Sequence, residues 1–146
     1  MTIFDWSRED NRCFGCGDNP IGLELEFTRE GDWVVASKAL NDLYRGFENS
    51  AHGGIIATLL DEASAWAAMA ETGRVSPSYE LRCKFLKPVP LKEKIRVRAK
   101  VTDRRHGIVK TKAEVRNEDD EALARGEITC RVLPEKIEEV EGELFQ

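Results

Sequence analysis

Hydrophobic and polar residues alternate along six segments of the chain, the period of strands with one buried and one solvated face. In one of these segments, Ile95 and Val97 alternate with Arg96 and Arg98. The predicted strands span residues 23–28, 33–39, 79–85, 95–101, 109–115 and 124–132. Short, turn-like connections join most of them, so neighbouring strands are predicted to be antiparallel.

Residues 53–70 have a helical period instead. Apolar side chains recur at steps of three and four residues: Ile55, Ile56, Leu59, Ala63, Trp66, Ala67 and Ala70. Ser50 or Asn49 is predicted to cap the helix start, and Gly73 to end it in the left-handed conformation. A second face carries small side chains and one carboxylate: Gly54, Ala57, Thr58, Asp61, Ala65 and Ala68. Either a neighbouring helix or a ligand could approach this small-residue face.

Six strands and one apolar helix predict an α+β fold in which a curved antiparallel sheet wraps a central helix. The dry face of the sheet needs a cover, and only residues 53–70 are apolar enough to supply it. We expect a single domain over residues 1–133, followed by an acidic tail over residues 134–146. The tail contains five glutamates and one lysine, so it carries most of the net charge of -5.

Composition and charge argue against several classes of protein. The chain has no broad excess of basic residues, so its charge does not suggest a nucleic-acid partner. The first ten residues lack an apolar signal segment, and no stretch approaches the length of a membrane span. We therefore expect a cytoplasmic protein with no membrane partner, whose four cysteines are reduced.

A Cys-x-x-Cys pair, Cys13 and Cys16, lies in a segment rich in turn-forming residues. Such a pair is half of a zinc site. However, no second pair completes it, because His52 and His106 are single and distant in sequence. We therefore expect a tight structural loop with no metal, and no cofactor elsewhere in the chain.

The start of the predicted helix could also take part in catalysis. Gly53 and Gly54 leave backbone N–H groups uncovered where a helix has no internal partners for them and where its dipole is positive. Such a position can polarise a carbonyl oxygen.

Three motifs resemble the corresponding segments of PaaI-like acyl-CoA thioesterases, which have the hotdog fold. They are Asn11-Arg-Cys-Phe-Gly-Cys-Gly-Asp-Asn-Pro-Ile-Gly-Leu23, Ala51-His-Gly-Gly-Ile-Ile-Ala-Thr-Leu-Leu-Asp-Glu62 and Phe85-Leu-Lys-Pro-Val-Pro90. The resemblance covers most of residues 11–133. It implies hydrolysis of an acyl-CoA substrate to a free acid and CoA.

The resemblance also implies roles for individual residues. Asp61 matches the family's nucleophile or general base, and Gly53 matches the glycine whose N–H binds the thioester carbonyl. Ser78 matches a hydroxyl that helps to hold the water in some members. Some members use an asparagine before the glycine pair, but Gly46 occupies that spacing and Asn49 lies nearer the helix.

Gly53 and Asp61 are eight residues apart, which is about 12 Å along one helix. A single thioester carbon cannot be reached by both groups of one chain. If both serve one reaction, Gly53 of one chain must meet Asp61 of another across a twofold axis. We therefore expect a homodimer, or a dimer of dimers.

Other side chains are candidates for substrate binding. His52, Gly54 and Asn49 adjoin the helix start, while Glu62 is a second acid that could line the pocket or make a structural contact. The turn at Arg104 and Arg105 could meet CoA phosphates. Trp33, Phe47, Trp66 and Met69 could shape an acyl pocket or fill the core.

Each assignment has a plain structural alternative. Asp61 could be a surface carboxylate, His52 a helix-start residue whose ring bonds the backbone, and Ser78 a strand-start hydroxyl. The arginines could be solvated hairpin charges. At the level of function, the alternatives are an acyl-CoA-binding protein without turnover and, less favoured by the position of His52, an acyl hydratase or dehydratase.

Overall fold

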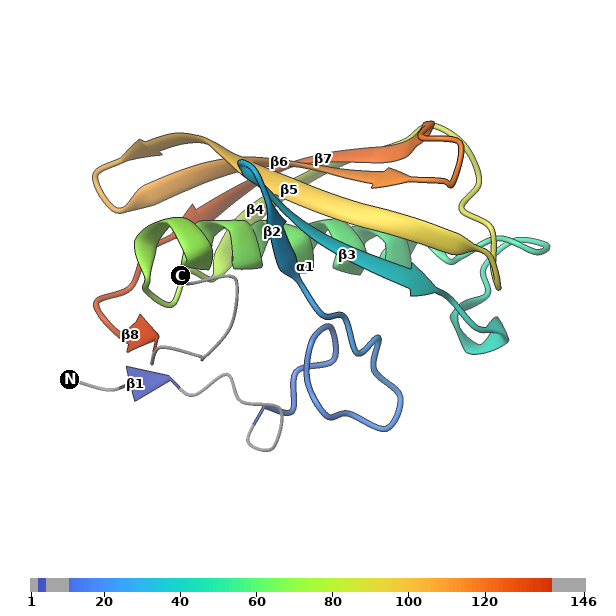
Figure 1. Ribbon diagram of the computed structural model, residues 1–146, viewed down its shortest axis with the longest axis horizontal. Coiled ribbons are helices and arrows are strands. Elements are labelled where there is room, and N and C mark those ends of the chain that lie inside the picture. The colour runs from blue at the N-terminus through green and yellow to red at the C-terminus, as the bar shows by residue number, and fades with distance from the viewer. Residues whose placement is uncertain (1–2, 5–10, 138–146) are drawn as a thin grey trace.

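The computed structural model describes residues 3–4 and 11–137 and consists of one long helix against one curved sheet (Figure 1). The strands are β1 (Ile3–Phe4), β2 (Thr28–Glu30), β3 (Trp33–Ala39), β4 (Ser78–Phe85), β5 (Lys94–Arg105), β6 (Ile108–Arg116), β7 (Ala122–Arg131) and β8 (Lys136–Ile137). The helices are the 3₁₀ turn η1 (Asp42–Tyr44) and α1 (Gly53–Thr72).

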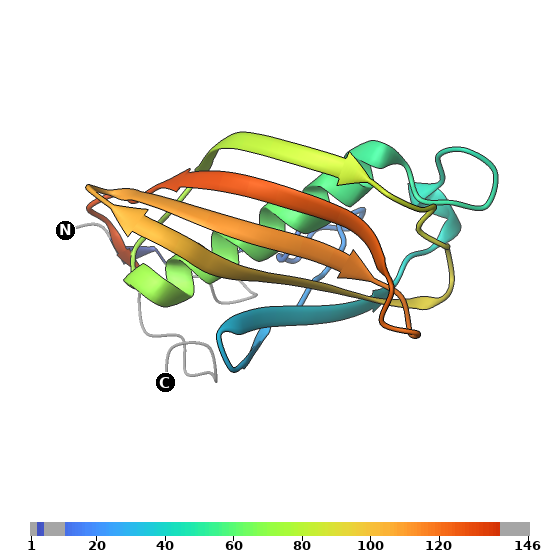
Figure 2. The same cartoon turned by 90° about the horizontal axis from the view of Figure 1, so that it is seen from above.

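The main sheet has six strands in the order β2-β3-β5-β6-β7-β4, and every neighbouring pair is antiparallel. The sheet does not close, so β2 and β4 are its edges. It curves over α1, as the view from above shows (Figure 2). The α+β hotdog arrangement predicted from the sequence is therefore confirmed.

The core lies between α1 and the concave face of the sheet. The helix contributes Leu59, Leu60 and Ala63, which are fully buried, and Trp66, whose ring stacks on that of Phe27 at 6.0 Å between centroids. Met69 is also buried. Trp66 and Met69 therefore fill the core in this chain.

Residues 23–27 alternate as predicted but do not form a strand. Leu23, Leu25 and Phe27 are buried, yet strand β2 begins only at Thr28. Glu24 has a φ of 51°, which interrupts extended backbone. The N–H groups of Leu23 and Leu25 donate to carbonyls of the 11–22 loop instead of to a neighbouring strand. The predicted strand at 23–28 was wrong for this reason.

The helix ends as predicted and starts differently. Gly73 is the C-cap, with a φ of 65°. At the other end, the cap is His52 and not Ser50 or Asn49. The Ser50 hydroxyl donates to the Phe47 carbonyl, and Asn49 Oδ1 accepts from Arg45, so both candidate caps are engaged before the helix begins.

The apolar side chains of β4 are not covered within one chain. Tyr79, Leu81 and Phe85 are 57, 40 and 57% exposed, although their alternation predicted a dry face. Strand β4 is one of the two edges of the sheet and lies beside α1, with no neighbour on its other side among the described strands (Figure 2). Leu81 and Phe85 therefore form an open apolar strip along a strand that also exposes charged side chains.

Two aromatic candidates for an acyl pocket lie elsewhere. Trp33 is half-buried under the guanidinium of Arg98, which lies 4.0 Å from the ring centroid, and Phe47 is 80% exposed in the loop before α1. A cation over a tryptophan face is a favourable contact in its own right. In this chain, Trp33 belongs to a charged surface and does not fill the core.

The first residues of the predicted acidic tail contact the end of α1. The N–H of Val75 donates to the carbonyl of Glu135, and that of Ile137 donates to the carbonyl of Gly73. Strand β8 pairs in parallel with β1. Residues 138–146 lie outside the described part of the chain. Among the described helices, none is long and apolar enough to cross a membrane.

Candidate active site

The first turn of α1 leaves one backbone donor available. The His52 ring accepts from Gly54 N–H at 2.9 Å through Nδ1, and the His52 carbonyl accepts from Ile55 and Ile56 at 2.9 and 3.1 Å. Within residues 3–4 and 11–137, the N–H of Gly53 donates to no acceptor. It is half-exposed and lies at the positive end of the helix dipole, so it can bind an incoming oxygen.

Asp61 and Ser78 form the second element of the candidate site. Asp61 lies in the third turn of α1, and Ser78 is the first residue of β4. The Ser78 hydroxyl donates to Asp61 Oδ1, and both residues are half-buried. Asp61 Oδ2 accepts no hydrogen bond from the part of the chain that the structure describes. The serine thus fixes the carboxylate while one oxygen remains free to take a proton or attack.

Two thiols near Asp61 are poor candidates for the nucleophile. Cys130 lies opposite Ser78 in the β4–β7 pairing. Burial, and to a smaller extent the charge of Asp61, raises the pKa of Cys130 to about 11. The same two causes raise the pKa of Cys83. Since the thiolate is the reactive form, both cysteines are protonated and unreactive near neutral pH.

The two elements of the site are far apart in one chain. Gly53 and Asp61 lie on the same continuous helix (Figure 1), so about 12 Å of helix axis separates them. Strand β4 runs antiparallel to the helix: Ser78 is bonded to Asp61, and the Phe85 ring lies 3.6 Å from where a Cβ on Gly53 would be. One chain therefore contains two half-sites.

The remaining candidates are not all gathered here. His52 and Gly54 are bonded to each other at the helix start. Asn49 is exposed and accepts from Arg45 Nη1 at 2.8 Å. Arg104 and Arg105 are exposed on the β5–β6 hairpin, at the opposite end of α1 from Gly53 (Figure 2). Among the described residues, neither arginine forms a hydrogen bond or ion pair with Asp61 or Ser78.

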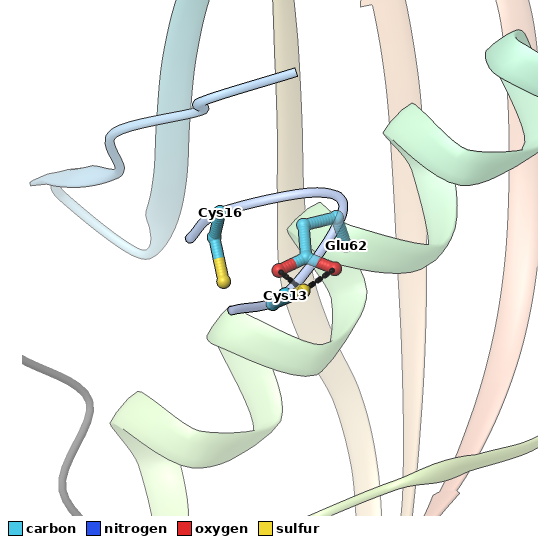
Figure 3. Close-up of side chains that lie close together, drawn as sticks. All are labelled: Cys13, Cys16 and Glu62. Atoms are coloured by element: carbon cyan, nitrogen blue, oxygen red, sulfur yellow. Dashed lines mark hydrogen bonds between the residues drawn. The ribbon is translucent and has the colours of Figure 1, made fainter. Parts of the chain in front are cut away.

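Glu62 lies in a separate cluster that the sequence did not predict. Its carboxylate oxygens lie 3.6 and 3.7 Å from Cys13 Sγ, with Cys16 beside them (Figure 3). Burial raises the pKa of Glu62 to about 7. A hydrogen bond with the Cys16 thiol lowers the pKa of Cys13, and the same contact raises the pKa of Cys16. The Cys-x-x-Cys spacing was visible in the sequence, but its carboxylate partner, 49 residues away, was not.

Comparisons with known proteins give the family. Residues 48–124, more than half of the chain, match the family model of the thioesterase superfamily. This range includes Gly53, Asp61 and Ser78. A search of curated protein sequences gives no match.

Solved structures share the fold. The PaaI protein of the E. coli phenylacetic acid degradation operon has a TM-score of 0.72 and 18% identity, covering 80% of this chain and 84% of that one. A Streptococcus mutans UA159 protein, solved with bound acetyl CoA, has a TM-score of 0.70 and 20% identity, over 78 and 91% of the two chains.

A third structure, of a protein from the thioesterase superfamily, has a TM-score of 0.68 and 22% identity over 75% of this chain. The present chain spans 56% of that longer protein. At such identities, the structural likeness shows the fold, and the match of residues 48–124 shows the family. The chain belongs to the thioesterase superfamily.

Proposed function

We propose that this protein hydrolyses acyl-CoA thioesters to a free acid and CoA, using Gly53 and Asp61 from two different chains. The Gly53 N–H binds the thioester carbonyl and stabilises the oxyanion that develops on it. Asp61 of the facing chain either takes a proton from a water that attacks the carbonyl carbon, or attacks that carbon itself and forms a mixed anhydride that water then hydrolyses to the free acid. In both routes the C–S bond breaks, and CoA leaves as a thiolate that is protonated in water.

The availability of the Gly53 N–H carries this proposal. Three neighbouring amides at the helix start are already paired, two with the His52 carbonyl and one with its ring. The remaining donor lies in the one position where a carbonyl oxygen would also gain from the helix dipole. A thiolate is a good leaving group, so one such donor and one carboxylate suffice for the reaction.

Exposed surfaces of the single chain support the two-chain site. Ala57, Thr58 and Ala65 on the small-residue face of α1 are only half-buried. Beside them lies the open apolar strip of β4, with Leu81 and Phe85. A second chain, related by a twofold axis through this surface, would cover both the small-residue face and the apolar strip of β4. It would also set the two α1 helices side by side and antiparallel. Gly53 of each chain would then approach Asp61 of the other.

The same arrangement offers a use for the distant arginines. With Gly53 facing the partner's Asp61, the partner helix continues past the start of α1 for eleven residues, about 16 Å, to its C-terminal end. The partner's β5–β6 hairpin, with its copies of Arg104 and Arg105, would lie at that same end. We assign these arginines to the CoA phosphates, for which guanidinium groups are suited. The Streptococcus mutans relative with bound acetyl CoA supports a CoA ligand for this fold.

Thiol release from a panel of short, medium, long and aromatic acyl-CoAs tests the proposed reaction. We expect turnover on at least one of them, followed with a thiol-reactive dye, and no release from the protein-free mixture. Absence of turnover across the panel would contradict the proposal. If acyl-CoA still raised the melting temperature, the protein would be a binding module.

A further inference from the structure

The 11–22 loop folds over the middle of α1 and brings three potential metal ligands together. Cys13 and Cys16 come from the loop and Glu62 from the helix, and their side chains point toward one another (Figure 3). One ligand atom from each residue lies within 4.8 Å of the other two. Cys13 Sγ is 3.6 Å from Glu62 Oε1 and 3.7 Å from Oε2. These contacts join parts of the chain that are 49 residues apart.

These distances are close to those of a zinc site. With Zn–S near 2.3 Å and Zn–O near 2.0 Å, two ligands of a tetrahedral ion lie about 3.5 Å apart. The observed sulfur–oxygen separations exceed that value by only 0.1–0.2 Å. Cys16 Sγ lies within 4.8 Å of the ligand atoms of Cys13 and Glu62, so a movement of about 1 Å would bring it to coordination distance.

Neighbouring groups already orient the two sulfur atoms. The Gly15 N–H donates to Cys13 Sγ at 3.3 Å, and the Asn11 side-chain amide donates to Cys16 Sγ at 3.3 Å. Asn11 is itself buried and also accepts from the Cys13 N–H at 2.9 Å. Donors of this kind stabilise thiolates and fix the orientation of metal ligands.

The loop backbone leaves little freedom around the cluster. A Cβ at Gly15 would lie 2.6 Å from the Glu62 carboxyl carbon, and one at Gly17 would lie 2.4 Å from the Cys13 nitrogen. Gly17 therefore requires glycine, because the clash is with backbone, and a side chain at Gly15 would displace the Glu62 carboxylate. Hydrogen bonds from Gly17 N–H to the Cys13 carbonyl at 2.9 Å and from Leu23 N–H to the Phe14 carbonyl at 2.7 Å close the loop.

A cation explains this grouping better than a disulfide does. All four cysteines are free thiols. No lysine, arginine or histidine within residues 3–4 and 11–137 forms an ion pair with Glu62. A bond between Cys13 and Cys16 would leave that half-buried carboxylate without a positive partner, whereas a divalent ion would bind all three groups.

We propose that Cys13, Cys16 and Glu62 form a zinc site that fastens the N-terminal loop to the centre of α1. Two thiolates select a soft or borderline ion, and a carboxylate is compatible with zinc. The fourth position would hold water, as in zinc sites with three protein ligands. This assignment does not depend on the acyl-CoA reaction.

The test is metal binding by the folded, reduced protein after removal of metal with a chelator. We expect about one equivalent of zinc per chain, a higher melting temperature with the metal, and thiolate-to-metal charge-transfer absorption with Co²⁺. Substituting a residue that only hydrogen-bonds to a metal ligand lowers metal affinity about 10- to 100-fold. Cys13→Ser and Glu62→Gln, which remove ligands themselves, should each lower zinc affinity by more than that.

Two matched variants serve as controls. Cys83→Ser removes a thiol outside the cluster, and Glu71→Gln changes an exposed carboxylate on the same helix. Both should bind zinc as the wild type does. If a ligand variant fails to fold, the Co²⁺ spectrum of the wild-type protein still decides. Reduced, folded wild-type protein that takes up no zinc would overturn the proposal, as would a Co²⁺ complex without thiolate bands.

Discussion

Asp61→Asn is expected to lower acyl-CoA turnover by about 100- to 10,000-fold, the range that a positioned acid–base group contributes. Asparagine keeps the shape of the side chain and an oxygen that can accept from the Ser78 hydroxyl. It cannot take a proton from water or attack as a carboxylate. The loss should therefore fall on the chemical step and leave substrate binding in place.

Single-turnover thiol release and acyl-CoA binding, measured on the same preparations, separate these two effects. Glu71→Gln is the control, because it removes an exposed carboxylate from the same helix. It should keep wild-type turnover. Normal turnover by Asp61→Asn would remove this carboxylate from the mechanism, whatever its effect on stability.

Features that depend on neighbouring residues were predictable from the sequence. The helical period predicted α1 over residues 53–70, two residues short of its observed end at Thr72, and Gly73 was correctly predicted as its C-cap. The alternation in 95–101 and 109–115 gave the centres of β5 and β6. In each case a local pattern and the final environment agree.

Features that depend on distant parts of the chain were not predictable. Residues 23–27 carry a strand pattern, but the 11–22 loop takes their backbone hydrogen bonds. Glu62 was predicted to line the pocket or to make a structural contact, and the identity of that contact, with Cys13, appears only when the loop folds over α1. Likewise, the alternation of β4 predicts a dry face, but Leu81 and Phe85 on that face stay exposed in the single chain.

Gly53→Pro is expected to lower turnover by about 100- to 1,000-fold, the cost of losing one oxyanion donor. Proline removes the N–H and suits the first position of a helix. His52 precedes it with φ of -61° and ψ of 139°, the extended conformation that a residue before proline prefers. Since the Gly53 N–H donates to no group in the described residues, its loss breaks no hydrogen bond there.

Gly53→Ala is the matched control for the proline variant. Its Cβ would lie 3.6 Å from the Phe85 ring, an ordinary contact, and it keeps the N–H. Melting temperatures of both variants should stay near that of the wild type, and thiol release should separate them. A proline variant as active as the alanine variant would show that this amide does not bind the carbonyl.

Mixing Gly53→Pro with Asp61→Asn tests which chain supplies each group. A dimer with one chain of each kind has one site with both groups intact and one site with both altered. Random assembly from equal amounts should therefore restore about one quarter of wild-type turnover. A mixture as inactive as either variant alone, although mixed dimers form, would place both groups in one chain. The 12 Å of helix between Gly53 and Asp61 argues against that result.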